Sequence, residues 1–388
     1  MLRWPTTHYM QPSQSLATPF QWLEKKLESF FDNKYWQYRL VALAVLLSLG
    51  SLLLFNYIHV SVGFRNLYHE MRQPGSVESM FWDDIIKQGA DPFTPQNYQP
   101  GTHEANQTFR LTLPLLSRLL RLNVATFYLF QVLFGFYFLW LVAGFVFQIL
   151  KNKVLTFYFL TGFTAIYTGA CFFINYFGHG DVFPFCFLVL ALLAKQPVLM
   201  FIFLQLAFWC DERALINASF IGLWCVWPLI EKVRTERKIT IREIPVSVYV
   251  LVMSAVVYVV LRKWLEIGLH LSIGHDAALS INSFFWSIST FGDKITRGYE
   301  GLWFVIIAAV VVLVLAKKWG QFALFFGAWL LNVFITTLVA DGTRALSFGF
   351  IGLLLAVQIL KDYIPSYQLK YLLIASALIS LMLPISFP

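Results

Sequence analysis

The chain has 388 residues and a net charge of +8, and 58% of its residues are hydrophobic while only 13% are charged. A soluble protein normally carries about twice that charged fraction, so the composition excludes an ordinary soluble enzyme and predicts one polytopic membrane domain. The Lys and Arg residues stand in short clusters between apolar runs, as charges that set membrane topology do, and no nucleic-acid partner is expected.

The first 38 residues are polar and aromatic and precede the first long apolar run. They lack a compact apolar stretch that ends in small residues, so no cleavable signal peptide is expected. Apolar residues recur there at helical spacing, which is typical of a helix in the membrane interface, with a solvated helix as the alternative. They are Phe20, Leu23, Leu27 and Phe30. We therefore expect a cytoplasmic or interfacial segment at 1–38 and the membrane domain at 39–388.

Apolar runs of membrane-helix length recur along that domain. A lipid-spanning helix needs about 20 mostly apolar residues, and the runs predict an all-α fold with about eleven transmembrane helices. The runs at 182–194 and 196–210 are too short to cross a bilayer alone, so we expect half-helices or one bent hairpin there. The expected spans are 39–60, 125–150, 154–176, 182–194, 196–210, 214–230, 244–262, 302–316, 319–340, 345–360 and 370–387.

Basic clusters beside these spans predict which side each loop faces, because Lys and Arg near span ends stay in the cytoplasm. Clusters before the first span, at 232–242 and at 317–318 all fall on one side. The N-terminus is therefore expected in the cytoplasm. The first and fourth outer segments, 61–124 and 263–301, are rich in aromatic residues and lack charge blocks, so we expect ordered interfacial helices in both.

The first outer segment gathers side chains that suit sugar transfer. A partly desolvated carboxylate can remove the proton of a sugar hydroxyl, and Arg or His can hold a phosphate leaving group. The alternative is a solvated loop with ordinary surface charges. The candidates for the base are Asp83, Asp84 and Glu70, and those for binding the substrate or its phosphate are His103, Glu104 and Arg110.

Four short polar motifs stand at the outer ends of apolar runs. Ionisable residues that interrupt such runs usually face a polar cavity or a partner, which makes them functional candidates. Helix capping and structural ion pairs within Glu212/Arg213 and Asp341/Arg344 are the alternatives. The motifs are Gly178-His179-Gly180-Asp181, Asp211-Glu212-Arg213, Gly274-His275-Asp276 and Asp341-Gly342-Thr343-Arg344. The candidates for substrate or phosphate binding in them are His179, Asp181, Asp211, Glu212, Arg213, His275, Asp341 and Arg344.

The sequence contains no motif that is typical of other catalytic chemistries. It has no Gly-rich phosphate loop, zinc helix, nucleophile elbow or Asp-x-Asp pair, and its four cysteines lie in apolar runs without metal-ligand spacing. No metal site is predicted, and the use of a divalent metal stays open. No cytoplasmic segment exceeds the 38 N-terminal residues, so a sugar donor should be a lipid and not a nucleotide.

This arrangement resembles the GT-C superfamily of polytopic glycosyltransferases, which use polyprenyl-phosphate-linked sugars on the extracytoplasmic side. Segment 108–116, Thr-Phe-Arg-Leu-Thr-Leu-Pro-Leu-Leu, is similar to the Arg-then-Pro segment that enters the second membrane region in bacterial members. The motifs at 211–213 and 341–344 look like their later helix-end motifs. The resemblance implies a base in the first outer loop, which carries over to Glu70, Asp83 and Asp84. The chain departs from the family in lacking an Asp-x-Asp or Glu-x-Asp pair and a large C-terminal soluble domain.

The sequence and the resemblance together predict an inverting membrane glycosyltransferase. It would move a sugar from a polyprenyl-phosphate carrier in the membrane lipid to a glycan, lipid or protein acceptor in the outer compartment. Inversion needs one base and one stabilised leaving group, so a single carboxylate and an Arg/His phosphate clamp suffice. A transporter or flippase for a lipid-linked or anionic substrate, and a polysaccharide polymerase or ligase, are the alternatives.

Overall fold

The computed structural model describes residues 14–77, 80–94, 107–236, 240–271, 289–337 and 341–383. Within these ranges the regular elements are all helices and no strand occurs, which confirms the expected all-α fold. The candidates His103, Glu104 and His275 lie outside the described residues.

Six helical segments of the described chain are long and apolar enough to cross a membrane. They are α2 (Trp36–Phe55), α7 (Val124–Leu150), α12 with α13 (Arg213–Ile230), α14 (Val246–Gly268), α16 with α17 (Phe291–Leu315) and α18 (Trp319–Thr337). A seventh forms if α8 (Lys153–Ala165) and α9 (Tyr167–Ile174), which meet at a bend of 59°, count as one span. By length and composition this is a multi-pass membrane protein. Six or seven segments meet this criterion, so the expected count of about eleven spans is not confirmed.

The remaining expected spans correspond to shorter helices. They are α10 (Val182–Leu193), α11 (Pro197–Cys210), α20 (Phe350–Tyr363) and α21 (Ser366–Met382). Helices α10 and α11 have 12 and 14 residues, and they pack against each other across a three-residue connection, as a hairpin does. Each of the four packs against other helices, and such helices need not match the thickness of a bilayer.

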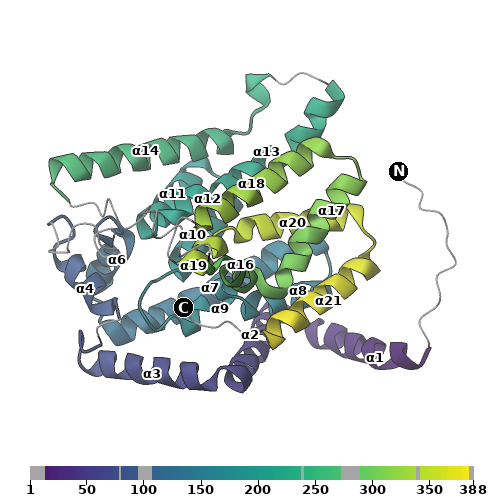
Figure 1. The fold of residues 1–388 in the computed structure, drawn as a ribbon, viewed down its shortest axis with the longest axis horizontal. Helices are drawn as coiled ribbons and strands as arrows, with labels where there is room; N and C mark the ends of the chain where they lie inside the picture. Colours follow the sequence, from purple (N-terminus) through teal and green to yellow (C-terminus); the bar gives the residue numbers. More distant parts are fainter. Residues whose placement is uncertain are drawn as a thin grey trace.

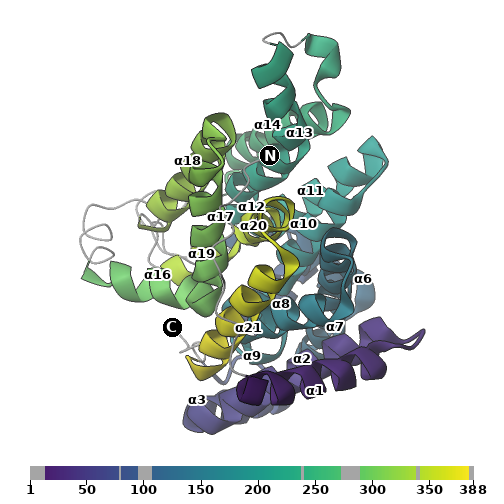
Figure 2. The same cartoon turned by 90° about the vertical axis from the view of Figure 1, so that its right-hand side faces the viewer.

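The hydrophobic core lies between two outer layers of helices. Helices α1 (Gln14–Phe31), α2 and α3 (Tyr57–Arg72) lie on one flank and α13 (Ser219–Glu236) and α14 on the opposite flank in both ribbon views (Figures 1 and 2). Helices α8, α10 and α20 lie between these flanks and are apolar on all sides, which is the pattern of a buried helix. Phe138 and Phe163 of this core are fully buried and their rings are 6.0 Å apart.

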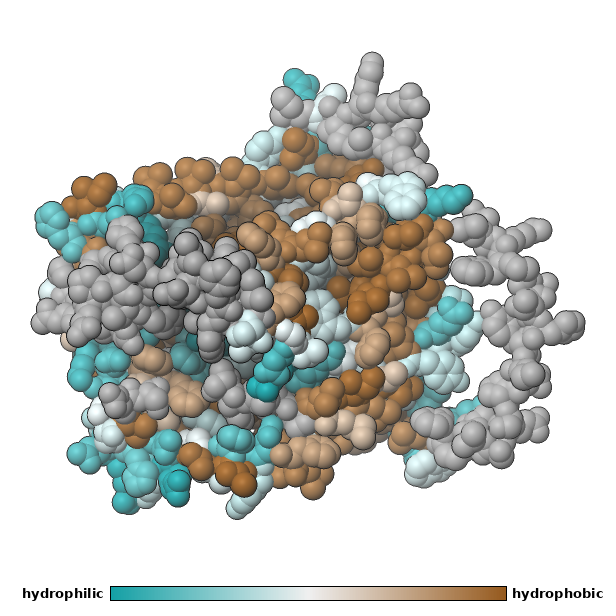
Figure 3. All heavy atoms as spheres, in the orientation of Figure 1, coloured by the Kyte–Doolittle hydropathy of each residue, from teal (hydrophilic) through white to brown (hydrophobic). Residues whose placement is uncertain are grey.

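The outer helices expose apolar side chains in bands, as lipid-facing helices do. Val252, Val256 and Val260 are exposed along one side of α14, and Leu330 and Leu331 are exposed on α18. Figure 3 shows hydrophobic residues along α14 and over the side formed by α17 (Trp303–Leu315) and α18, while hydrophilic residues gather toward the end that holds α3. An exposed apolar surface of this extent marks contact with lipid or protein.

The two segments expected to hold interfacial helices contain short helices among their described residues. Helices α4 (Trp82–Ala90) and α6 (Thr112–Leu120) lie at the left-hand end in Figure 1, and α1 lies toward the other end. Helices α16 (Phe291–Tyr299) and α19 (Gly342–Ser347) pack against each other. The 3-10 turns η1 (Ile241–Glu243) and η2 (Glu300–Leu302) complete the fold. Which end faces the cytoplasm stays a prediction.

Candidate functional site

A buried cluster of carboxylates and guanidinium groups joins the loops between the central helices. Asp181 precedes α10, Asp211 ends α11, Arg213 begins α12 (Arg213–Asn217) and Arg344 lies in α19. Each of these four side chains is buried. Interruptions of the apolar helices thus bring distant polar motifs to one place, which an apolar interior tolerates only if the charges are paired.

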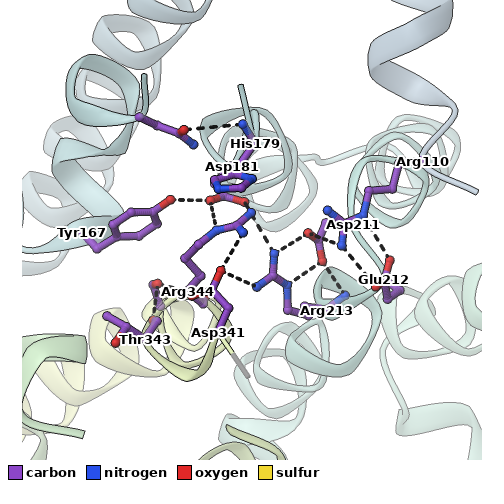
Figure 4. Close-up of polar contacts among 12 residues, drawn as sticks. Arg110, Tyr167, His179, Asp181, Asp211, Glu212, Arg213, Asp341, Thr343 and Arg344 are labelled. Carbon is purple, nitrogen blue, oxygen red and sulfur yellow. Dashed lines mark hydrogen bonds and ion pairs between the residues drawn. The ribbon is translucent and has the colours of Figure 1, made fainter. Parts of the chain in front are cut away.

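Two two-pronged ion pairs form the centre of this cluster (Figure 4). Arg344 donates from Nε to Asp181 Oδ2 at 2.7 Å and from Nη2 to Oδ1 at 2.8 Å, and its Nη1 is 2.6 Å from Asp341 Oδ2. Arg213 donates from Nε to Asp211 Oδ1 at 2.8 Å and from Nη2 to Oδ2 at 2.6 Å. Bidentate Arg–carboxylate pairs fix orientation as well as charge, so these residues hold α10, α11, α12 and α19 together.

Longer contacts connect the two pairs. Arg213 Nη2 is 3.7 Å from Asp181 Oδ1, and its Nη1 is 4.0 Å from Asp341 Oδ2. The guanidinium of Arg213 also lies over the ring of Phe348 at 5.2 Å. Tyr167, the first residue of α9, donates its hydroxyl to Asp181 Oδ2 at 2.5 Å. The bend between α8 and α9 therefore places a further donor on the carboxylate that Arg344 already holds.

Arg110 binds to the edge of the cluster through longer contacts. Its Nη2 is 3.4 Å from Asp211 Oδ2 and 3.2 Å from Glu212 Oε1, and its Nε is 3.4 Å from Glu212 Oε2. Arg110 follows a turn in which its backbone N–H donates to the carbonyl of Gln107, just before α6. The side chain of Arg110 is 11% exposed and that of Glu212 is 31% exposed, so this pair lies nearest to solvent.

The arginines of the cluster lower the pKa values of Asp181 and Asp211, so these carboxylates stay ionised. Burial alone would raise the pKa of Asp181, but the guanidinium of Arg344 holds that pKa well below its usual range. Burial opposes ionisation of Asp211 too, and Arg110 and Arg213 hold its pKa well below the usual range. Burial, followed by repulsion from Arg344, lowers the pKa of His179 well below its ordinary value. At neutral pH the carboxylates are therefore ionised and His179 is neutral.

A narrow cavity of about 20 Å³ borders this cluster, with room for about one water molecule. Its lining joins Arg110 and His179 to one face of α4, which contributes Phe81, Ile85 and Gln88. The rest of the lining comes from Gln107, Leu113, Pro114, Gly178 and Cys210. The ring of Phe81 lies 5.1 Å from that of His179. The cavity is thus polar at the arginine and apolar along α4.

Hydrogen bonds at both ends hold α4 over the cavity. At its start, Trp82 donates from Nε1 to the carbonyl of Tyr176 at 2.6 Å, in the loop that leads to His179. Near its end, Gln88 donates from Nε2 to the carbonyl of Thr108 at 3.0 Å, in the segment that leads to Arg110. A short helix with a buried Trp and Gln is therefore fixed against both polar walls.

The structure separates the three carboxylates expected to include a base. Asp84 stands next to Ile85 and four residues before Gln88, which line the cavity, but it is not itself among the lining residues. Asp83 pairs with Lys87, which raises the pKa of that lysine through a hydrogen bond and its charge. Asp83 points about 100° away from Asp84, as adjacent helical residues do, whereas Lys87 also interacts with the charge of Asp84.

Glu70 lies fully buried at the end of α3. It accepts hydrogen bonds from the backbone N–H groups of Gly75 at 2.7 Å and Val77 at 3.2 Å. Glu70 therefore closes the turn between α3 and α4 and is not among the residues that line the cavity.

Eight of the expected binding residues come together at the cluster and its cavity. They are Arg110, His179, Asp181, Asp211, Glu212, Arg213, Asp341 and Arg344. The expected pair within Asp341/Arg344 forms. In place of a pair between Glu212 and Arg213, Glu212 binds Arg110 and Arg213 binds Asp211.

Sequence reasoning missed Tyr167 as a partner of Asp181. Its only sequence feature is a hydroxyl group within an apolar run, next to the break between α8 and α9. Sequence reasoning also missed Lys294 of α16, which is buried and whose side chain lies against Gly342 beside Asp341.

The carboxylates of the cluster are held by arginines, and the described residues contain no group of three or more His, Cys, Asp or Glu that could hold a metal ion. The four cysteines are free, as expected for core residues. A search against protein-family models, a search of curated proteins and a search of solved structures each found no match.

Proposed function

We propose that the protein transfers a sugar from a polyprenyl-phosphate carrier to an acceptor outside the cytoplasm, with inversion at the anomeric carbon. The observation that carries the proposal is the cavity whose lining joins Arg110 and His179 to α4, the helix that carries Asp84. A guanidinium group suits a phosphate leaving group, and a carboxylate on the helix beside the cavity suits the acceptor hydroxyl.

The proposed reaction is one displacement. The acceptor oxygen forms a bond to the anomeric carbon while the bond from that carbon to the phosphate oxygen breaks. The acceptor proton goes to the carboxylate of Asp84, and the polyprenyl phosphate leaves with the bonding electron pair. Arg110 stabilises the negative charge that grows on the phosphate, which is the charge that the transition state develops. Because one displacement occurs at carbon, the sugar inverts.

Asp84 is the base that this arrangement favours over the two other candidates. The carboxylate of Asp83 is engaged by Lys87, and that of Glu70 is fully buried against backbone N–H groups. A general base must come within about 3 Å of the proton that it removes. Asp84 stands on the helix that lines the cavity, next to Ile85, and would meet this requirement by turning toward the cavity.

The central pairs of the cluster provide a rigid frame for the proposed site. Arg213 and Arg344 are each held by two-pronged contacts at 2.6–2.8 Å. Catalytic groups act best when the residues around them are locked in place. We therefore assign Arg213 and Arg344 a positioning role and assign the phosphate contact to Arg110, which lines the cavity.

The test is a transfer assay with purified protein in proteoliposomes. The donors are polyprenyl-phosphate hexoses of several sugars and carrier lengths, offered with glycan, lipid and peptide acceptors, and the readouts are release of polyprenyl phosphate and the anomeric configuration of the product. Asp84→Asn should lower turnover by at least about a hundredfold with donor binding kept. The same substitution one residue earlier, Asp83→Asn, is the matched comparison and should retain turnover.

The assay also separates the competing functions. If Asp83→Asn, Asp84→Asn and Glu70→Gln all transfer sugar at the native rate, general-base catalysis from this segment is refuted. If the wild-type protein moves a labelled lipid-linked sugar across the bilayer and leaves its sugar–phosphate bond intact, the protein is a transporter. Products that extend by repeated units would identify a polymerase instead.

A further inference from the structure

The ion pairs of the cluster fall into two classes by distance. Arg213 and Arg344 contact Asp211 and Asp181 at 2.6–2.8 Å. The contacts between Arg110 and Glu212, in contrast, measure 3.2 and 3.4 Å, beyond the 2.7–2.9 Å of a tight charge-assisted hydrogen bond. The two oxygens of Glu212 therefore face the guanidinium group of Arg110 in bidentate fashion, but at distances longer than those of a tight charge-assisted pair.

Glu212 can leave this position at small structural cost. Its side chain is 31% exposed, and among the described residues Arg110 is its one ion-pair partner. Rotation of the carboxylate toward solvent restores its hydration and breaks neither of the two central pairs. Asp211, which is buried and bound by Arg213, has no such freedom.

The cavity beside Arg110 is too small to hold a phosphate group as it stands. Its volume of about 20 Å³ admits about one water molecule, whereas a phosphate group is several times larger. Glu212 is not among the residues that line the cavity, but its two oxygens already face Nε and Nη2 of Arg110. A phosphate that binds this edge of the guanidinium group must therefore displace Glu212. Both present two oxygens to the planar fork of a guanidinium group, and a phosphate diester carries one negative charge, as a carboxylate does.

We infer that Glu212 occupies the phosphate position of Arg110 and that a substrate phosphate binds by displacing it. Glu212 is thus an internal competitor that keeps the guanidinium of Arg110 paired and oriented until a phosphate replaces it. The exchange leaves the net charge of the cluster unchanged for a singly charged phosphate. This inference rests on the proposed function only for the statement that the phosphate belongs to the sugar donor.

The test measures binding of inorganic phosphate, which reports the exchange without any transfer reaction. Glu212→Gln keeps the shape of the side chain and an oxygen acceptor but removes its charge, and it should tighten phosphate binding by about tenfold, because the competing state is removed. The matched control is Glu266→Gln, which makes the same change at an ion pair with Lys263 on α14 and should leave phosphate affinity unchanged. Arg110→Lys introduced into the Glu212→Gln protein should abolish the gain.

Isothermal titration in detergent gives these affinities, and sulfate serves as a second probe. If Glu212→Gln fails to fold, Glu212→Asp, whose carboxylate is withdrawn by one methylene, should still bind phosphate more tightly than the wild type. Equal phosphate affinity in the wild type and the Glu212 variants refutes the exchange, even where sugar transfer is observed. A tenfold gain without any transfer keeps the exchange and refutes the proposed reaction.

Discussion

Asp181 offers the sharpest test of how far the buried cluster stabilises the fold. Its side chain is 1% exposed, and it accepts two hydrogen bonds from Arg344 and one from the hydroxyl of Tyr167. Removal of one partner of a buried pair costs roughly 3–5 kcal/mol, because the other charge is left uncompensated. Arg344 keeps its contact with Asp341, so we expect Asp181→Asn to lower the free energy of unfolding by about 3 kcal/mol.

Asp293→Asn provides a control with the same substitution at an exposed Asp–Arg pair whose contact has the same length of 2.7 Å. Asp293 Oδ1 is 2.7 Å from Arg297 Nε, but these side chains are 56% and 39% exposed. An exposed pair contributes roughly 0–1 kcal/mol. Equilibrium unfolding in mixed detergent micelles should therefore separate the two variants by about 2 kcal/mol or more. Equal losses for Asp181→Asn and Asp293→Asn would show that burial adds nothing to the contribution of the cluster.

The folded protein lowers the pKa of His179 through burial and the charge of Arg344, so the unfolded chain takes up the proton first. The free energy of unfolding should therefore be highest above about pH 6.5, the ordinary histidine pKa, and should decrease below that pH. The decrease should be smaller in His179→Gln. An unchanged pH profile in that variant would contradict this reasoning. Cysteine-accessibility labelling of Asp83→Cys and Asp341→Cys should report the same membrane face and Lys318→Cys the opposite one. Labelling of Asp83→Cys and Asp341→Cys from opposite faces would rule out a shared site.

The convergence of the polar motifs follows from the sequence, but their partners do not. Basic clusters assign the motifs at 178–181, 211–213 and 341–344 to one side of the membrane, and the structure brings them together. The sequence pairs Glu212 with its neighbour Arg213, yet α12 begins at Arg213 and neighbouring side chains then point in different directions. Pairing depends on where each helix begins, and hydropathy places that point only within several residues.

The count of spans shows the same limit for the fold. The apolar runs at 182–194 and 345–360 predict membrane helices, and the structure forms α10 and α20 there. Both helices lie within the protein, where their side chains pack against other helices. Lipid and the interior of a membrane protein are both apolar, so composition alone does not separate a lipid-facing helix from a buried one. Length is the remaining criterion, and α10 has only 12 residues.

The choice among the carboxylates also needed three-dimensional information. The sequence places Asp83 and Asp84 side by side after an aromatic pair and leaves either as the base. Once α4 begins at Trp82, Asp84 stands next to Ile85, which lines the cavity, while Lys87 engages Asp83. An offset of one residue on a helix thus changes which neighbours each of the two carboxylates has.

Arg213 and Arg344 are held by short ion pairs, whereas Arg110 has longer contacts, and this difference affects how a phosphate could bind to the cluster and leave it. A reacting phosphate must be held firmly and then released, which a guanidinium buried within a two-pronged pair cannot do without breaking the fold. Arg344 and Arg213 have that kind of pairing, whereas Arg110 faces the cavity and a partly exposed Glu212. A fixed frame with one exchangeable pair at its rim allows a charged substrate to enter without an unpaired charge being buried at any stage. Loss of Glu212 should therefore alter phosphate affinity far more than it alters stability, and loss of Asp181 should do the reverse.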